Sequence, residues 1–380
     1  MALSNHNAEE VADETAEDFS SRVVRQITGG LACLGIAMGV ETGLFDVLIS
    51  LGGDPKTSQE IADIADLKER YVREWLGCMA ASDIVTFEPA QERYWLPAHR
   101  MGILQSSMLS MAIPCLAGGF FEVAECFKKN GPAGVEYDKY PKLDEVLDKL
   151  HQPFFRDQFL QEFIPSMPKL LQQLKRGIQV LEVGCCEGDS LRMLASCFPK
   201  TAVYGLDISP TVIKQARVKT KELGLTNLEF VCEDVCAMPA DWTWKFDYIF
   251  IYFVLHDLSY PDTGLREMYR VLKPGGTLSV VDTVTHTKLQ DNIADEDKGY
   301  VLTQFTMSLM NCLPVSSHPG DGAGLGAMWG REKAREMLED ANFEVLSISA
   351  TNAELNGLHY LCSKPICENN NMRSNGTNGI

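Results

Sequence analysis

A glycine-rich turn between an apolar strand and a helix is the segment with the clearest chemical meaning. It runs from Gly184 to Gly188 and follows the mainly apolar residues 178–183, which include Glu182. Glycines at such a turn let the backbone approach a ligand closely and present the amides of a helix N-terminus. The turn therefore predicts a site for a nucleotide-like cofactor.

Three cofactor classes compete for this turn: NAD(P), ATP and S-adenosylmethionine. A Walker-type ATP loop needs Gly-Lys-Ser/Thr, which the turn lacks, and the dinucleotide pattern G-x-G-x-x-G fails because Cys186 stands at its second glycine. Glu182 lies two residues before Gly184, where a carboxylate would not help to hold a pyrophosphate but would help to hold an ammonium group. The turn therefore favours S-adenosylmethionine, whose methionine part carries that ammonium.

Two more acidic residues follow the next two predicted strands. Asp207 lies 207 − 184 = 23 residues after Gly184, at the position where a carboxylate accepts both ribose hydroxyls. Asp234 is placed to hydrogen-bond an adenine amino group, and the amide of Val235 to meet a ring nitrogen. The predicted cofactor-binding residues are Glu182, Gly184, Gly188, Asp207, Ile208, Asp234, Val235 and Tyr252.

His256 and Asp257, just past the fourth predicted strand, are the candidate catalytic residues. Histidine titrates near neutrality and is the commonest general base, and a neighbouring carboxylate can orient it. A base is needed only where the methyl acceptor must lose a proton. The alternatives for His256 are a structural role in the cofactor loop and a surface histidine unrelated to the site.

Alternating strands and helices after Arg176 predict the fold that holds these residues. The pattern indicates an α/β, Rossmann-like sheet of seven mostly parallel strands with helices on both faces. The last two strands follow each other without a helix, so one of them must be antiparallel. Strands are predicted at 178–183, 202–206, 228–232, 248–252, 277–281, 343–349 and 359–363, and helices at 190–197, 210–223, 264–272 and 331–341.

The N-terminal part has the pattern of a winged helix: helices over 34–48, from 57 or 58 onward and over 68–80, then strands at 84–87 and 93–96. Such a unit can bind DNA. The third helix, however, is nearly balanced in charge, which favours a packing or dimerisation role.

The predicted domains are a disordered tail (1–20), a winged-helix or dimerisation domain (21–104), a helical linker and pocket cap (105–175), the cofactor-binding domain (176–366) and a second disordered tail (367–380). The long segment 284–330 is either a substrate lid or an ordinary helical insertion.

Composition narrows the partners and the location. With 52 acidic against 34 basic residues and a net charge of −18, nucleic-acid binding is disfavoured. The N-terminus lacks a signal pattern, and no stretch of about 18 uncharged apolar residues predicts a membrane span. Scattered cysteines indicate reduced thiols in the cytoplasm. Cys185, Cys186, Cys232 and Cys236 lack paired C-x2-C spacing, so no metal site is expected.

The residues 176–363 resemble class I S-adenosylmethionine-dependent methyltransferases, with Val-Leu-Lys-Pro-Gly-Gly at 271–276 before the fifth strand. The segments Glu-Arg-Tyr-Val-Arg-Glu-Trp-Leu at 69–76 and Gly-Leu-Gly-Ala-Met-Trp-Gly at 324–330 are similar to a bacterial and animal methyltransferase family with a mycobacterial structural representative. Two positions depart from the resemblance. Cys186 replaces a usual glycine, and Leu258 replaces the Trp that follows the catalytic His-Asp pair in small-molecule O-methyltransferases.

The resemblance implies transfer of a methyl group from S-adenosylmethionine to an oxygen or nitrogen of a small-molecule acceptor, by an enzyme for which a homodimer is one expected assembly. Two alternatives stay open. One is a catalytically silent S-adenosylmethionine-binding protein that acts in regulation or interaction, and the other is an NAD-dependent oxidoreductase.

Overall fold

The computed structural model describes residues 14–102, 107–351 and 357–366. The chain divides into two compact units. The first comprises Met1–Gly118 and Pro141–Leu147, and the second comprises Gly119–Tyr140 and Asp148–Ile380. Residues 1–13 and 367–380 of the two predicted tails lie outside the described residues.

The first unit begins with the long helix α2 (Ala16–Glu41). Thr15 caps this helix: its hydroxyl accepts a hydrogen bond from the amide of Asp18, and the Asp18 carboxylate bonds back to the amide of Thr15. This capping box satisfies amides that a helix N-terminus leaves without partners. Residues 16–20 therefore begin a capped helix. The sequence analysis was wrong to place them in a disordered tail.

Small residues let the C-terminal part of α2 approach its neighbours closely. A Cβ atom on Gly39 would lie 2.5 Å from the Trp75 ring and 2.6 Å from the Phe45 ring. The Trp75 indole also donates a hydrogen bond to the carbonyl of Gly35, at 2.8 Å. This end of α2 is thus part of the core of the first unit, whereas the residues before it are mostly exposed.

The remainder of the first unit confirms the predicted winged helix. A three-stranded sheet of order β1-β3-β2 packs with short helices, and Thr57 caps α4 through a capping box with Glu60. The elements are α3 (Leu44–Ser50), β1 (Lys56–Thr57), α4 (Ser58–Ala65), α5 (Glu69–Ala81), β2 (Thr86–Glu88), β3 (Arg93–Trp95), η1 (Ala98–Arg100), η2 (Met108–Met111) and α7 (Ala112–Gly118).

The second unit is built on a seven-stranded sheet of order β6-β5-β4-β7-β8-β10-β9. Its strands are β4 (Gln179–Val183), β5 (Ala202–Asp207), β6 (Leu228–Cys232), β7 (Phe246–Tyr252), β8 (Leu272–Thr283), β9 (Glu344–Ala350) and β10 (Gly357–Ser363). The first five run parallel, and β10 is antiparallel to both β8 and β9. The predicted α/β Rossmann-like fold is confirmed, including the antiparallel strand near the C-terminus.

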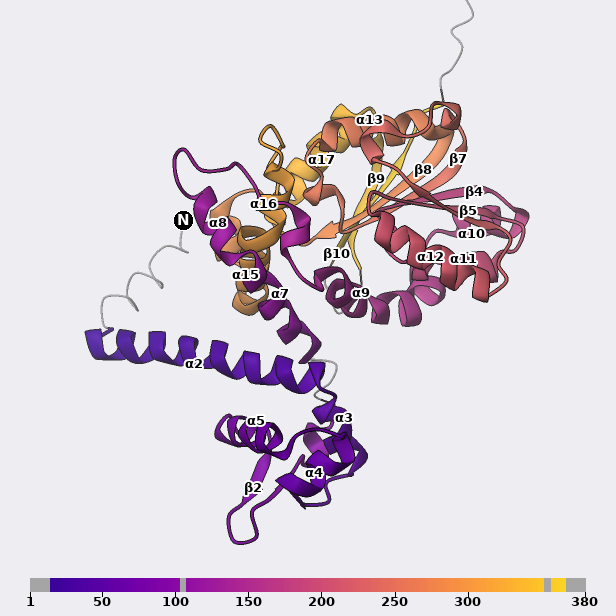
Figure 1. Cartoon of the computed structure of the whole chain (residues 1–380). Helices are drawn as coiled ribbons and strands as arrows, with labels where there is room; N and C mark the ends of the chain where they lie inside the picture. The colour runs from indigo at the N-terminus through magenta and orange to yellow at the C-terminus, as the bar shows by residue number, and fades with distance from the viewer. Residues whose placement is uncertain (1–13, 103–106, 352–356, 367–380) are drawn as a thin grey trace, which may run out of the picture. The chain divides into compact units, whose positions relative to one another are not determined.

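Helices cover both faces of this sheet, as Figure 1 shows. One face packs α11 (Asp189–Cys197), α12 (Pro210–Glu222) and α10 (Pro168–Arg176) against side chains such as Val180 and Phe250. The other packs α13 (Pro261–Val271) and α17 (Gly330–Asp340) against Leu181 and Ile249. Alternate residues of β4 and β7 thus serve opposite cores, which explains their nearly continuous apolar sequence.

Helices also fill the segment predicted as a helical linker (105–175) and the long segment 284–330. Before the sheet lie α8 (Phe120–Cys126), η3 (Tyr137–Lys139), α9 (Leu143–Pro153) and the π-helix η4 (Phe154–Phe163). Between β8 and α17 lie α14 (Leu289–Ile293), α15 (Lys298–Met307), the π-helix η8 (Ser308–Cys312) and α16 (Leu313–Ser317). The second segment is thus a helical insertion, and it brings Cys312 toward the carboxyl edge of the sheet.

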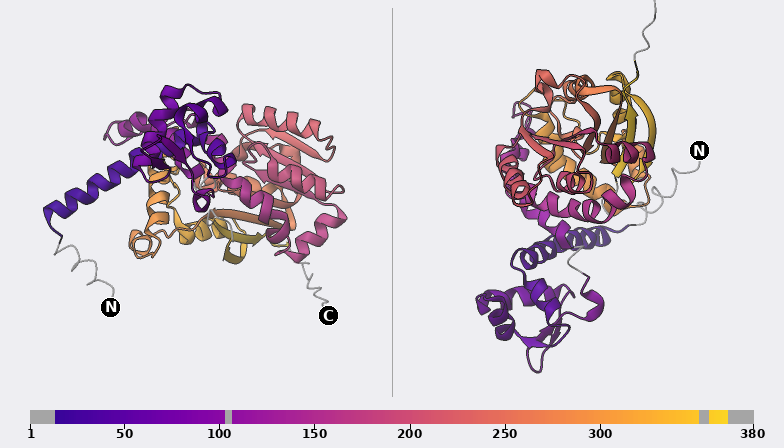
Figure 2. Two further views of the ribbon diagram at one scale, coloured as in Figure 1. Left: turned by 90° about the horizontal axis from the view of Figure 1, so that it is seen from below. Right: turned by 90° about the vertical axis from the view of Figure 1, so that its right-hand side faces the viewer.

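Helix α2 also bears on the prediction that the chain has no membrane span. By length and composition it could cross a membrane, with a mean hydropathy of 1.5 over an 18-residue window of which 11% is buried. The sequence analysis required an uninterrupted uncharged run and did not find one, because Arg25 and Glu41 interrupt it. In Figure 2, α2 is the long indigo helix. Core helices of soluble proteins and signal sequences pass the same test of length and composition.

Candidate active site

The strand order arranges the predicted site residues in a row. In the sheet, β6, β5, β4, β7 and β8 are consecutive neighbours. Because they are parallel, their carboxyl ends lie at one edge, where ligands of open α/β sheets bind. The register pairs Asp207 with Cys232, and Val183 with both Leu206 and Ile251. The carboxyl ends of these strands and the segments just after them carry Asp234, Asp207, Glu182, His256 and Asp282, in that spatial order.

The turn after β4 requires its glycines. Gly184 and Gly188 have φ angles of +69° and +77°, and a Cβ atom would lie 2.4 Å from Val254 or 2.3 Å from the Phe230 ring, respectively. Cys186 also has a positive φ, of +46°. Its amide donates a hydrogen bond to Asp207 at 3.0 Å, so the cysteine keeps the left-handed backbone that a glycine would adopt more easily.

Asp207 holds the loops of two strands together at the edge of the sheet. One carboxylate oxygen accepts from the amide of Cys186, and the other accepts from the amide of Ser209 at 2.9 Å. The side chain is therefore held next to the glycine turn. Ile208 follows with 70% of its surface exposed, which leaves an apolar side chain beside a fixed carboxylate.

Asp234 is exposed at the end of the next loop, and its carboxylate accepts from the amide of Cys236 at 2.8 Å. Val235 is buried, 6% exposed, in the core behind it. The edge formed by Asp207, Ile208 and Asp234 thus combines two carboxylates with one exposed apolar side chain.

Glu182 lies deeper than the other acidic residues, only 4% exposed. Its carboxyl group accepts a hydrogen bond from the hydroxyl of Ser190, on the first turn of α11. Burial raises the pKa of Glu182 to about 8, and the charge of Asp207 adds to this, while the Ser190 bond opposes it. Glu182 is therefore mainly a neutral acid at pH 7 until a cation or another donor compensates its charge.

Tyr252, at the end of β7, is surrounded by aromatic rings. Phe154 stacks on it at 5.0 Å, and His151 and Phe253 contact it edge-on at 5.0 and 4.9 Å between ring centroids. The buried Tyr252 hydroxyl has no hydrogen-bond partner among the described residues. Burial lowers the pKa of His151 to about 4, so this imidazole is neutral at pH 7.

His256 is 3% exposed, in the short helix η7 (Leu255–Asp257) after β7. Its Nδ1 lies 2.7 Å from Oδ1 of Asp282, and its Nε2 lies 3.3 Å from Oδ1 of Asp257. Burial alone would lower the pKa of His256, but the carboxylates of Asp257 and Asp282 outweigh it and raise the pKa. Because Asp282 accepts from Nδ1, Nε2 is the nitrogen that is left for chemistry.

Asp282 is a site residue that the sequence analysis missed. It is fully buried near the end of β8, where its Oδ1 also accepts from the Thr283 amide at 2.7 Å and from the Trp329 indole at 3.3 Å. Its position after the fifth predicted strand repeats the signal that identified Asp207 and Asp234, an acidic residue at a parallel strand's carboxyl end. The signal was available, because Asp282 directly follows the predicted strand 277–281 just as Asp207 follows the predicted strand 202–206.

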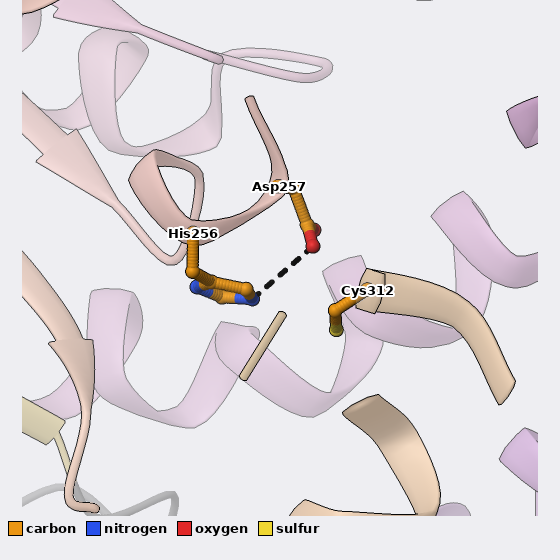
Figure 3. A group of neighbouring side chains, drawn as sticks. All are labelled: His256, Asp257 and Cys312. Atoms are coloured by element: carbon orange, nitrogen blue, oxygen red, sulfur yellow. Dashed lines mark ion pairs between the residues drawn. The ribbon is translucent and has the colours of Figure 1, made fainter. Parts of the chain in front are cut away.

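Cys312 is the second residue that the sequence analysis missed. Its thiol, on the insertion between β8 and α17, faces His256 and Asp257, as Figure 3 shows. The His256 nitrogen, the Asp257 oxygen and the Cys312 sulfur lie within 4.8 Å of one another. Burial raises the pKa of the Cys312 thiol to about 11. Nothing in the sequence links residues so far apart along the chain.

Two family models match the chain. Residues 174–351 match a methyltransferase domain, and residues 29–106 match an Rv2258c-like winged HTH domain. The first match contains the glycine turn, the acidic strand ends and the His256–Asp282 pair.

Curated relatives match about half of the chain. A demethylmenaquinone methyltransferase of Listeria welshimeri is 40% identical over 164 residues, which are 43% of this chain and 62% of that protein. One of the same name from Oceanobacillus iheyensis is 25% identical over 228 residues, 59% of this chain and 90% of that protein. The chain thus spans less than two thirds of the length of the Listeria relative.

Solved structures share the fold of nearly the whole chain. Human N-acetylserotonin methyltransferase in complex with S-adenosylmethionine has a TM-score of 0.61 at 16% identity and covers 93% of this chain and 99% of that one. An O-methyltransferase family protein from Burkholderia thailandensis has a TM-score of 0.59 at 14% identity and covers 93% and 100%. At 14 and 16% sequence identity, these similarities show a shared fold and nothing beyond it.

The burial of Glu182 makes a prediction about stability and pH. In the unfolded chain this carboxyl ionises at about pH 4.3, whereas in the folded protein it stays protonated up to about pH 8. Between these values ionisation favours the unfolded chain, so the wild type loses up to about 1.4 kcal/mol of unfolding free energy per pH unit. Glu182→Gln stays neutral and can still bond to Ser190. Its melting temperature should exceed that of the wild type by a margin that grows from about pH 5 to pH 8.

Glu332→Gln is the control of opposite sign. Although burial acts against it, hydrogen bonds from Thr287 and His286 lower the pKa of Glu332 to about 2. Glu332→Gln should therefore melt below the wild type at pH 7 and converge with it in acid. A melting difference for Glu182→Gln that does not change with pH would contradict the burial of a neutral acid.

Proposed function

The chain joins an Rv2258c-like winged domain to a methyltransferase domain, and from this premise we propose that it transfers a methyl group from S-adenosylmethionine to an oxygen or nitrogen of a small-molecule acceptor. The observation that carries the proposal is the strand order β6-β5-β4-β7-β8. It places the proposed donor residues Asp234, Asp207 and Glu182 in one row with His256 and Asp282.

The edge of the sheet fits the donor part by part. The carboxylate of Asp207, already fixed beside the glycine turn, would accept the ribose hydroxyls. Asp234 and the amide of Val235 would meet the adenine edge, next to the exposed side chain of Ile208. Glu182 would attract the ammonium of the methionine part, and Gly184 and Gly188 leave the backbone open to the ligand. Bound there, S-adenosylmethionine supplies a sulfonium methyl that a nucleophile can displace.

The same residues disfavour the two other candidate functions. An NAD-dependent oxidoreductase would need a pyrophosphate at the turn, where Glu182 is a poor neighbour and Cys186 replaces the second glycine. A catalytically silent protein would have no use for a histidine that two carboxylates hold at the carboxyl edge. Both observations support an enzyme.

His256 is the proposed base and Asp282 its positioning residue. Asp282 accepts from Nδ1, which orients the ring so that Nε2 can take a proton from the acceptor once it has released its own. Together with Asp257, it also stabilises the imidazolium that proton transfer produces. The in-line displacement itself needs alignment and exclusion of water more than it needs covalent chemistry.

The aromatic residues around Tyr252 support a small acceptor. His151, Tyr252 and Phe253 form an apolar wall at the carboxyl edge, and the Tyr252 hydroxyl is a buried polar group with no partner among the described residues. A small molecule with one polar group could pack on these rings and bond to that hydroxyl.

Helix α2 is the proposed assembly surface. Its residues Val24, Ile27, Leu31, Leu34 and Met38 are each 45 to 60% exposed and follow each other at alternating spacings of three and four. That is the spacing of a coiled-coil seam, which a second helix of the same kind covers. We propose that a second copy of the chain covers this stripe, so that the protein is a homodimer.

The proposed partners exclude nucleic acid. On α5, the basic side chains Arg70 and Arg73 pair with Glu74 and Glu69 of the same helix. The face that would enter a DNA groove therefore offers little positive charge. The proposed location is the cytoplasm, since the cysteines that the structure describes are all free thiols.

Donor binding tests the function directly. Calorimetry should show S-adenosylmethionine binding to the wild type, and Asp207→Ala should weaken it by about 10- to 100-fold, because hydrogen bonds to a charged group contribute about 1.5–3 kcal/mol. Asp241→Ala, an exposed carboxylate before β7, is the control and should bind as the wild type does. Heat with NAD and none with S-adenosylmethionine would contradict the proposal.

The base is tested on an acceptor found by screening hydroxylated and aminated small molecules with a labelled methyl donor. His256→Ala should lower kcat by about 10²- to 10⁴-fold at unchanged donor affinity. Asp282→Asn should also lower kcat more than it raises KM, and Asp282→Glu should restore part of the loss. Unchanged turnover in His256→Ala would remove the base role, whereas donor binding with no acceptor methylated would favour the silent protein.

The α2 stripe is tested by light scattering after size exclusion. The wild type should have twice the mass of the chain, and Ile27→Glu with Leu31→Glu should give monomers, because four charges in a dimer seam cannot be buried unpaired. Gly29→Glu adds the same kind of charge on the opposite face, where nothing lies within 4 Å, and should remain dimeric. A monomeric wild type that floats with phospholipid vesicles would overturn the dimer in favour of a membrane surface.

A further inference from the structure

The cluster of His256, Asp257 and Cys312 has the composition of a metal site. Its three ligand atoms, a ring nitrogen, a carboxylate oxygen and a thiol sulfur, lie within 4.8 Å of one another. Figure 3 shows the imidazole and the carboxylate on one short helix and the thiol on a separate one. Those elements are η7 and the π-helix η8, which ends at Cys312. Single π-helical turns often occur at functional sites.

The surroundings of His256 match those of a metal-bound histidine. Histidine ligands usually donate their other ring N–H to a carboxylate, which fixes the ring and makes the ligating nitrogen more basic. Asp282 does this here, at 2.7 Å from Nδ1, and is itself held by the Thr283 amide and the Trp329 indole. The Nε2 atom is thereby aimed at Asp257 and Cys312.

The local charge also favours a cation. The side chains of Asp257 and Asp282 flank a single imidazole, Asp257 also interacts with the Cys312 thiol, and Oδ2 of Asp282 lacks a hydrogen-bond partner among the described residues. Two carboxylates and one imidazolium leave an excess of negative charge in a nearly enclosed space. A divalent cation would compensate it more completely than one proton does.

The ligand set selects the kind of cation. A nitrogen, a sulfur and one carboxylate oxygen suit Zn²⁺ or Co²⁺, whereas Mg²⁺ and Ca²⁺ prefer oxygen ligands only. With bonds of about 2.0–2.3 Å, tetrahedral ligands lie about 3.3–3.8 Å apart. His256 and Asp257 already meet that separation at 3.3 Å, so Cys312 has to approach by up to about 1.5 Å. Three protein ligands leave a fourth position for water.

We propose that His256, Asp257 and Cys312 bind one thiophilic divalent cation of the Zn²⁺ kind, and that the bound cation switches off the methyl transfer. On binding, the Cys312 thiol and the His256 imidazolium each lose one proton to solvent, so that Cys312 coordinates as thiolate and His256 coordinates through Nε2. That nitrogen then has no lone pair for the acceptor proton. The binding site stands on its own geometry, and only its effect on turnover rests on the proposed function.

Cobalt spectroscopy tests the site without any need for activity. Co²⁺ added to the metal-free full-length protein should give a thiolate charge-transfer band in the near ultraviolet that saturates at one ion per chain. Cys312→Ser should abolish this band. Cys236→Ser is the matched control, since its partly buried sulfur bonds to the carbonyl of Tyr260 and a serine hydroxyl can do the same. It should keep the band.

A second variant covers the case in which Cys312→Ser does not fold. Asp282→Asn leaves all three ligands in place but removes the carboxylate behind His256, so Co²⁺ and Zn²⁺ affinity should fall by about 10- to 100-fold. Absence of the band in the wild type, or a band that survives in Cys312→Ser, would overturn the proposal.

Turnover then separates this proposal from the proposed function. Zn²⁺ should inhibit methyl transfer and a chelator should reverse it, with donor affinity in calorimetry unchanged, and Cys312→Ser should need at least about tenfold more Zn²⁺ for the same inhibition. Turnover that a chelator abolishes would overturn the inhibitory role. A protein that shows the cobalt band but binds no S-adenosylmethionine would retain the metal site and lose the proposed function instead.

Discussion

The parallel pairing of β4 with β5 on one side and with β7 on the other is the constraint on which the site depends. Because parallel strands end at a common edge, each strand contributes the residues that follow it to the same surface. The chain needs only one suitable side chain after each strand to build an extended site. Asp234, Asp207, Glu182, His256 and Asp282 are separated in sequence but are neighbours in strand order.

Burial of charge divides this edge into two parts. Asp207 and Asp234 keep contact with solvent, and backbone amides satisfy their carboxylates. Glu182 and the carboxylates around His256 are enclosed, so each depends on a specific partner: the Ser190 hydroxyl for Glu182, and the imidazole for Asp257 and Asp282. The enclosed part responds more strongly to a bound cation, because a low local dielectric strengthens each charge.

Short-range sequence patterns were enough to predict the fold of the second unit and its glycine turn. The alternation of apolar runs with amphipathic helices carries the topology, and an acidic residue after an apolar run identifies a strand end. Asp282 has the same position after its predicted strand as Asp207 and could have been predicted by the same argument. Cys312 could not be predicted, because its approach to His256 depends on how a helical insertion folds back over the sheet. The α2 stripe was missed for another reason: only its periodicity, and not an uncharged run, distinguishes it.

Asp282 influences both proposed roles of His256, as a base and as a metal ligand. By holding Nδ1 of His256, it determines that Nε2 alone faces the Asp257 and Cys312 side chains. One nitrogen has one lone pair, so a proton and a metal ion compete for it. The Asp282 carboxylate, which makes His256 a better base, therefore also makes it a better metal ligand. Whether the site acts as a base or as a metal site then depends on Cys312, since a soft thiolate ligand favours Zn²⁺ while contributing nothing to the removal of a proton.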